Sequence, residues 1–235
     1  MALLSTAPTA LLPYTQPLRL APWVRRYRPR LVAWPAGGQW VDAVSGRLLG
    51  SAISPGDTTT TRLGRATTAN GTQGGWLLPL PQPATWTEFS LVAFWAVTGG
   101  GSNSYGRLID GAARYIYMGG NSLEFQATFA GGPAFWSVAY PFDGLWHGMA
   151  LTHDAGAATN LPAAWRDGTP LAAPSVVLAS NGVYSGADTS LGVLNRADNG
   201  RCINGGIALL ALFESVLPAS VAARLSRPPM ALVAA

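Results

Sequence analysis

The sequence predicts an all-β protein, a two-sheet antiparallel sandwich of the jelly-roll type. Short apolar or alternating runs recur from Leu31 to Phe213, and Gly-rich or Asp-Gly turns separate them. Asp-Gly is typical of hairpins because both central residues of such a turn must tolerate positive φ. Only Pro218–Ser226 has helical spacing, with Pro218 at its first turn. Many short strands at this spacing are typical of a sandwich or jelly roll.

The expected strands follow one another along the chain, each bounded by turn residues. They are Leu31–Trp34, Gln39–Asp42, Arg47–Ile53, Gly75–Leu78, Glu88–Val97, Tyr105–Asp110, Arg114–Met118, Ser122–Phe129, Ala134–Tyr140, Leu145–His153, Ala163–Arg166, Leu171–Ala172, Thr189–Leu194 and Ile203–Phe213. Within the last of these, Ile207–Phe213 contains no polar side chain. It is too short to span a bilayer and suits a strand buried on both faces.

Four segments in chain order resemble the LamG-like, concanavalin A-like family. Trp86–Trp95 resembles its first long core strand, and Asp143–His153 contains the Asp-Gly-Leu-Trp-His sequence that begins a later one. Ala164–Leu171 resembles the hairpin that follows, and Asn199–Leu225 the closing turn, strand and helix. The resemblance covers roughly residues 31–228 and implies a jelly-roll sandwich with one short C-terminal helix. The jelly-roll sandwich does not by itself imply a function, because lectins, glycosidases and virion proteins share this fold.

Residues 1–30 differ from the remaining chain. They contain five prolines and no acid, and their arginines account for the whole net charge of +4. Such a segment cannot build its own core, so we expect an extended basic arm at 1–30 and the sandwich at 31–235. Aromatic residues among the arginines favour docking on a partner surface, and a disordered tail is the alternative. The expected partner-binding residues are Arg19, Trp23, Arg25, Arg26, Tyr27, Arg28 and Arg30.

Charged residues make up only 11% of the 235 residues, and hydrophobic residues make up 49%. This balance favours a surface that is hidden in an assembly, or equally a β-protein that is soluble through Gly, Ser and Thr. The N-terminus lacks the basic region of a signal peptide, and prolines interrupt it, so we do not expect export by this segment. Cys202 is the single cysteine, which we expect to be a small packed residue.

Acidic and histidine side chains do not form an expected catalytic or metal site. Sandwich glycosidases commonly pair two carboxylates on one strand, but none of Glu88, Glu124 and Glu214 has another acid within four positions. We therefore expect no enzyme activity and no catalytic residue. His147 and His153 share one face of a strand about 20 Å apart, too far to bind one metal, and we expect His147 to be a core histidine.

Aromatic and Asx residues supply the candidates for ligand binding. Trp136 and Tyr140 lie on one face of their strand and Tyr105 lies near a turn, so these three could stack on a glycan. Calcium is a further option, since lectins of this fold use Asp and Asn oxygens; the candidates are Asp188, Asn195, Asp198 and Asn199. Capping of tight turns explains these four residues better, so we expect no metal and no other cofactor.

The resemblance implies a function as well as a fold. Free-standing LamG-like chains of this kind resemble those encoded by bacteriophages, which implies a non-enzymatic virion protein: a capsid decoration, head–tail or tail-attached protein. Its partners would be other virion proteins, in a homo-oligomeric or multicopy assembly, and its location the virion. The alternative is a carbohydrate-binding module or adhesin for host surface glycans. Nucleic acid is not an expected partner, because five arginines without a reading helix or RNA-binding motif are weak support, and neither is a membrane.

Overall fold

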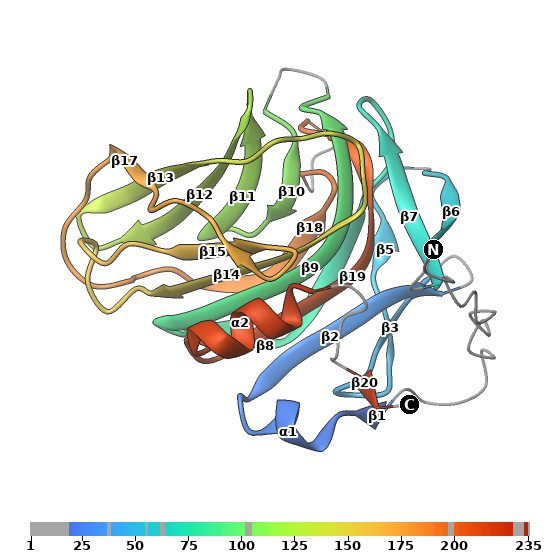
Figure 1. Ribbon diagram of the computed structural model, residues 1–235, viewed down its shortest axis with the longest axis horizontal. Helices are drawn as coiled ribbons and strands as arrows, with labels where there is room; N and C mark the ends of the chain where they lie inside the picture. Colours follow the sequence, from blue (N-terminus) through green and yellow to red (C-terminus); the bar gives the residue numbers. More distant parts are fainter. Residues whose placement is uncertain are drawn as a thin grey trace, which may run out of the picture.

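The computed structural model describes residues 19–234 with gaps at 37–38, 55, 62–63, 102–104, 197–199 and 228–232. Two large antiparallel sheets pack face to face (Figure 1). The expected all-β sandwich is therefore confirmed. In the part of the chain so described, no helix is both long and apolar enough to cross a membrane.

The closing strand predicted from the sequence lies in the middle of the larger, ten-stranded sheet. Along this sheet the strands are β16 (Thr169–Pro170), β15 (Ala163–Arg166), β14 (His147–Asp154), β9 (Glu88–Gly99), β19 (Asn204–Phe213), β2 (Pro29–Ala36), β3 (Gln39–Asp42) and β4 (Leu48–Leu49). The first half of β19 also pairs with β7 (Gly64–Asn70), which in turn pairs with β6 (Thr58–Thr61). The β6–β7 hairpin thus extends one end of the sheet beside β19 (Figure 1).

The second sheet has eight strands, four of which form a meander. Its order is β17 (Ser175–Leu178), β13 (Gly132–Ala139), β12 (Ser122–Phe129), β11 (Arg114–Gly119), β10 (Arg107–Asp110), β18 (Asp188–Val193), β8 (Trp76–Ala84) and β5 (Ser51–Ala52). Short turns join β10 through β13, so neighbours in the chain are also neighbours in the sheet.

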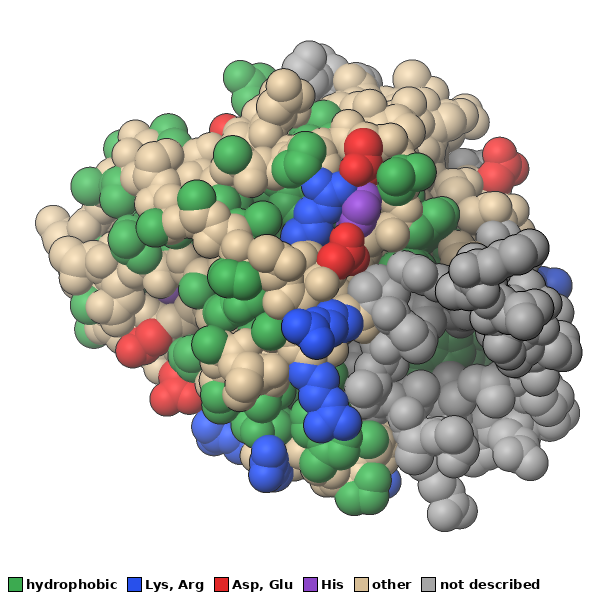
Figure 2. Space-filling view, viewed as in Figure 1, with side chains coloured by type: hydrophobic (Ala, Val, Ile, Leu, Met, Phe, Trp, Pro, Cys, Tyr) green, Lys and Arg blue, Asp and Glu red, His purple; other side chains and the backbone are tan. Residues whose placement is uncertain are grey.

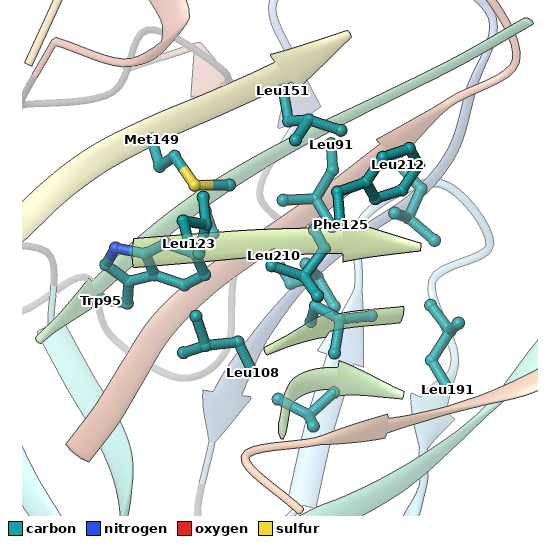
Figure 3. Close-up of a cluster of buried hydrophobic side chains, with 14 of the residues drawn as sticks. Leu91, Trp95, Leu108, Leu123, Phe125, Met149, Leu151, Leu191, Leu210 and Leu212 are labelled. Atoms are coloured by element: carbon teal, nitrogen blue, oxygen red, sulfur yellow. The ribbon is translucent and has the colours of Figure 1, made fainter. Parts of the chain in front are cut away.

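Alternate side chains from the two sheets meet in the main core (Figure 3). Leu91 and Trp95 of β9 and Leu210 of β19 point inward from the larger sheet, and Leu123 and Phe125 of β12 meet them from the smaller one. The residues between these positions on β9 and β19 also become buried, in a second cluster on the outer face. Burial on both faces explains the continuous apolar runs of these two strands.

The second cluster is covered by α2 (Ala219–Leu225) and by the chain that precedes β2. There β1 (Arg19–Leu20) pairs with β20 (Val233–Ala234), and α1 (Pro22–Arg25) buries Val24 completely. The expected extended arm is therefore wrong from residue 19 onward, and β2 begins at Pro29. Residues 1–18 of the expected arm lie outside the described residues. The segment from residue 19 to β2 folds onto the domain because the outer faces of β9 and β19 need an apolar cover, which Leu20 and Val24 supply.

Several strands were missed or misplaced. The threonine-rich strands β6 and β7 and the edge strand β17 have no counterpart among the predicted runs, and 171–172 is not a strand. Strand β8 continues to Ala84 through Pro79, Pro81 and Pro83, although proline cannot donate to a β ladder. A second helix, α1, was also not expected. In these segments pairing with neighbouring strands and packing outweigh local propensity.

Candidate functional site

An array of aromatic and polar side chains covers the outer face of strands β10 to β13. Because side chains alternate along a strand, Ile116, Phe125 and Trp136 point into the core and their neighbours point outward. The register places Arg107, Tyr117 and Glu124 in one row across the sheet, and Tyr115, Gln126 and Phe135 in the next. We call this surface, together with Tyr105 from the turn before β10, the tyrosine face.

Four rings form a continuous strip on the tyrosine face. The ring centroids are 6.0 Å apart for Tyr105 and Tyr117, 5.6 Å for Tyr117 and Tyr115, and 6.2 Å for Tyr115 and Phe135. Tyr105 is 51% exposed, Tyr115 and Phe135 are half-buried, and Tyr117 between them is only 9% exposed. The strip therefore presents an apolar surface that runs from the turn before β10, across β11, to β13.

Arg107 lies on the tyrosine strip. Its guanidinium carbon is 3.6 Å from the centroid of the Tyr115 ring and 4.8 Å from that of Tyr117, which are cation–π contacts. Its Nε lies 3.3 Å from the Asp110 carboxylate. Nε and Nη1 are buried without a well-directed hydrogen bond in the described structure. Arg107 is thus held in place by stacking while part of its donor capacity is unused.

The two central tyrosines remain neutral at physiological pH. Burial raises the pKa of Tyr115, and the nearby Arg107 only partly opposes this. Burial, together with the neighbouring Glu124 carboxylate, raises the pKa of Tyr117 still further above its usual range. Both phenols therefore keep their O–H donors beside the carboxylate of Glu124 and the amide of Gln126, whose Oε1 is buried without a partner in the described chain. The face can bind a ligand that has both apolar and hydroxylated surfaces.

The structure assigns the predicted aromatic candidates to different environments. Tyr105 is exposed on the tyrosine face, as a glycan-stacking residue must be. Trp136 and Tyr140 are only 1% and 2% exposed, so the expectation that they bind a glycan is wrong. Trp136 stacks on Phe125 in the core, and the Tyr140 hydroxyl accepts a hydrogen bond from Trp95 Nε1 at 2.9 Å. Period-two alternation placed them on one face, but the sequence did not show that this face points inward.

The predicted partner-binding residues of the arm lie close to α2. Arg28 is 3.8 Å from Glu88, and Arg30 pairs with Glu214, so the domain itself neutralises these two charges. Among the described residues, Arg25 and Arg26 have no acidic partner. Trp23 packs edge-on against Tyr27 and lies under the guanidinium of Arg224. Figure 2 shows basic side chains gathered at the bottom of this view, where Figure 1 has α1 and α2. The side chain of Arg19 lies outside the described residues, and docking of the arm stays a prediction.

The calcium candidates that the structure describes form structural hydrogen bonds. Asp188 accepts the backbone N–H of Ala113 at 2.7 Å, and the Asn195 amide donates to the Gly74 carbonyl at 2.8 Å. Asp198 and Asn199 lie outside the described residues. No group of three or more metal-ligating side chains occurs in the described part of the chain. Cys202 is buried, donates to the Gln73 carbonyl and has a thiol pKa raised by burial, as expected of a packed residue.

The histidine that lies in the core is His153 and not, as expected, His147. His147 is not a core residue: Asp143 and Asp167 bracket its ring, with Nε2 3.0 Å from Asp143 Oδ1 and Nδ1 2.5 Å from Asp167 Oδ2, and Arg166 lies against it. It occupies the end of β14, where the face that is inward further along reaches the surface. His153 is the core histidine, 1% exposed, and burial lowers its pKa to about 4.

The carboxylates of Asp143 and Asp167 are held by this network. Burial would raise the pKa of Asp143, but hydrogen bonds from the Leu145 backbone N–H, Arg166 and His147 lower it to about 2. Asp167 in turn accepts the backbone N–H of Gly148. The network therefore fixes the segment before β14, and the expectation of no catalytic residue stays a prediction.

No family model and no curated protein matches this chain, so the LamG-like resemblance stays one of sequence motifs. Solved structures do match. The receptor-binding domain of botulinum neurotoxin C/D mosaic serotype has a TM-score of 0.60 at 12% identity, over 81% of this chain and 49% of that one. Domain 4 of AbnA, an extracellular GH43 arabinanase from Geobacillus stearothermophilus solved with arabinotriose, has a TM-score of 0.58 at 17% identity, over 85% and 98%.

A further match is a structure of botulinum neurotoxin type C, a toxin whose cell entry is dependent upon interaction with two ganglioside molecules. Its TM-score is 0.58 at 14% identity, over 82% of this chain and 49% of that one. This chain thus spans about half the length of the neurotoxin chains and nearly all of the arabinanase domain. At these identities the likeness shows the fold: the chain has the jelly-roll sandwich architecture of these domains.

Proposed function

We propose that this sandwich is a non-catalytic carbohydrate-binding domain and that the tyrosine face is its glycan site. The supporting observation is the strip formed by Tyr105, Tyr117, Tyr115 and Phe135, with Arg107 stacked on it. Flat exposed rings pack against the C–H faces of sugars, and adjacent donors and acceptors bind the hydroxyls. The tyrosine face combines both kinds of group on a rigid sheet.

Two comparisons support this class of ligand. The arabinanase domain was solved with arabinotriose, and the type C neurotoxin is described as depending on two ganglioside molecules. These ligands belong to those proteins. They support a glycan as the ligand here because both proteins share the sandwich, and they do not define which sugar this chain takes.

The test is a glycan array followed by calorimetric titration of each hit with the purified full chain. We expect Tyr115→Ala and Tyr105→Ala to weaken binding about tenfold, because each removes a stacking ring. Tyr27→Ala is the matched control, since that half-buried tyrosine packs on Trp23 near α1. Binding that is equally strong in all three variants, or an array without hits, would contradict the proposal.

A place in a virus particle is a second proposal, and it concerns location and partners. Support comes from the sparse surface charge and from Arg25 and Arg26, which have no acidic partner in the described structure. Here the domain would be a multicopy virion component that displays its glycan site. Because residues 19–30 belong to the folded domain, the test is deletion of 1–18 and, separately, Arg25→Glu with Arg26→Glu. Undiminished incorporation of both variants into particles would count against arm-mediated anchoring.

A further inference from the structure

An open groove of about 470 Å³ lies on the outer face of the ten-stranded sheet, away from the tyrosine face. Its floor is made of small residues, Ala69, Ala96, Gly205 and Gly206. Trp146, which immediately precedes β14, lines it as well. The threonine-rich strands β6 and β7, which the sequence did not predict, supply further lining residues.

The sheet register explains how an indole comes to lie in this groove. His147 pairs with Trp95, so Trp146 comes next to Ala96; Ala96 pairs with Gly206, and Gly206 with Thr68. Small residues on β9 and β19 leave room for the indole to extend across both strands. A Cβ on Gly206 would lie 3.1 Å from the indole Cη2. Phe94 stacks on the indole, with ring centroids 5.4 Å apart, and fixes its orientation.

The rim of the groove carries polar groups that the protein does not use. Asp57, Gln73 and Asn204 are exposed, and within the described chain their side chains make no hydrogen bond or ion pair. The indole N–H of Trp146 likewise has no hydrogen-bond acceptor among the described residues. A carboxylate, two amides and an indole donor therefore line the groove around one aromatic ring, and their hydrogen-bonding capacity is open to a ligand.

Trp146 is held in place from its C-terminal side. Its neighbour His147 is clamped between Asp143 and Asp167, and Arg166 bonds to Asp143. On the N-terminal side, the Gly144 backbone N–H donates to the Val97 carbonyl at 3.0 Å. Both ends of this short segment are thus attached to the sheet. A preorganised ring binds ligand with less loss of side-chain entropy than a mobile one.

We propose that this groove is a second binding site, distinct from the tyrosine face, and that it takes a neutral oligosaccharide. The indole supplies the stacking surface, and Asp57, Gln73 and Asn204 supply acceptors and donors for hydroxyl groups. Among the described residues that line the groove, Asp57 is the only charged one, so anionic sugars are repelled. The tyrosine face differs in this respect, because it holds Arg107.

The experiment uses the ¹⁵N-labelled full chain, in which nine tryptophans give nine indole N–H signals. The Trp146 signal is assigned as the one lost in Trp146→Phe. Arabinotriose, maltotriose, cellotriose and xylotriose are then titrated, with sialyllactose as the anionic comparison. We expect at least one neutral trisaccharide to shift the Trp146 signal with a Kd of about 1 mM or tighter, and sialyllactose to leave it unchanged. No shift with any neutral trisaccharide, or an equal shift with sialyllactose, would overturn the proposal.

Variants separate this site from the tyrosine face. Asn204→Ala and Gln73→Ala remove exposed rim groups without touching the core, so they keep the fold, and we expect a five- to tenfold loss of affinity at the groove, roughly one hydrogen bond each. Trp23→Ala is the control, because it removes a partly buried tryptophan elsewhere on the same face and should leave the affinity at the groove unchanged. Tyr115→Ala should leave the Trp146 shift intact. If Tyr115→Ala abolishes that shift, the groove is not an independent site; if Asn204→Ala and Gln73→Ala both bind as the parent does, the rim is not the recognition surface.

Discussion

Arg107 lies over Tyr115, with its guanidinium carbon 3.6 Å from the ring centroid, and the same side chain reaches Tyr117 at 4.8 Å. One arginine, the first residue of β10, thereby contacts two tyrosines of the neighbouring strand β11. The contact keeps the rings in a fixed relation on the outer face of the smaller sheet. This arrangement leads to the first of four predictions.

Replacing Arg107 weakens glycan binding at the tyrosine face. Arg107→Ala removes the stack on Tyr115 and the guanidinium donors, so we expect about a tenfold loss of affinity in calorimetric titration. Arg26→Ala is the matched control, because Arg26 stacks on Tyr27 at 4.8 Å near α1. An Arg107→Ala protein that binds the same glycan as tightly as the parent would show that the strip does not need this residue.

The two neighbours Phe135 and Trp136 have opposite roles. Trp136→Ala leaves a cavity beside Phe125, and we expect it to lower the free energy of unfolding by about 3–5 kcal/mol in guanidinium chloride. Phe135→Ala removes a half-buried ring on the outer face, so we expect a smaller loss of stability and a clear loss of glycan affinity. The reverse pattern would mean that β13 presents its other face to solvent.

His153 makes stability depend on pH. Burial lowers its pKa from 6.5 to about 4, so between these values the unfolded chain binds a proton that the folded protein does not. The stabilisation is complete above pH 6.5 and decreases as the pH falls toward 4, by about 3 kcal/mol at most. In His153→Gln, whose amide can still donate to the Asn160 carbonyl, we expect this part of the slope to disappear. Unfolding at pH 7.5 and 4.5 measures the difference, and His147→Gln should keep the slope.

Asp42 stabilises the turn after β3. Its buried carboxylate accepts the backbone N–H groups of Val32, Val44 and Ser45, each at 3.0 Å. Asp42→Ala leaves these donors without an acceptor, so we expect a loss of about 3 kcal/mol or more in unfolding free energy, and Asp42→Asn should lose less. Asp154→Ala, which removes one exposed bond to Gly156, is the control. Equal stability of the Asp42 and Asp154 variants would contradict this role.

Local chemistry predicted the parts of the fold where one signal dominates. The buried strand β19, the hairpins at Asp110 and Asp167, the turn at Asp143 and the helix after Pro218 each follow from an apolar run or a turn residue. The strands β6 and β7 could not be predicted in this way. Their threonines and alanines form a strand because β19 offers them a pairing edge from more than 130 residues further along the chain.

The candidate sites show the same division. The sequence alone determined that Trp136 and Tyr140 share one face of their strand and that Tyr105 lies near a turn. It did not determine which alternate set faces water, because period-two patterning is symmetric until a second sheet covers one side. The tertiary structure decided this by packing Trp136 against Phe125, which turned Phe135 outward, and by bringing Trp146 over Gly206 across two strands. Contacts between distant segments have no signature in local sequence, so both sites depend on how the sheets pair and pack.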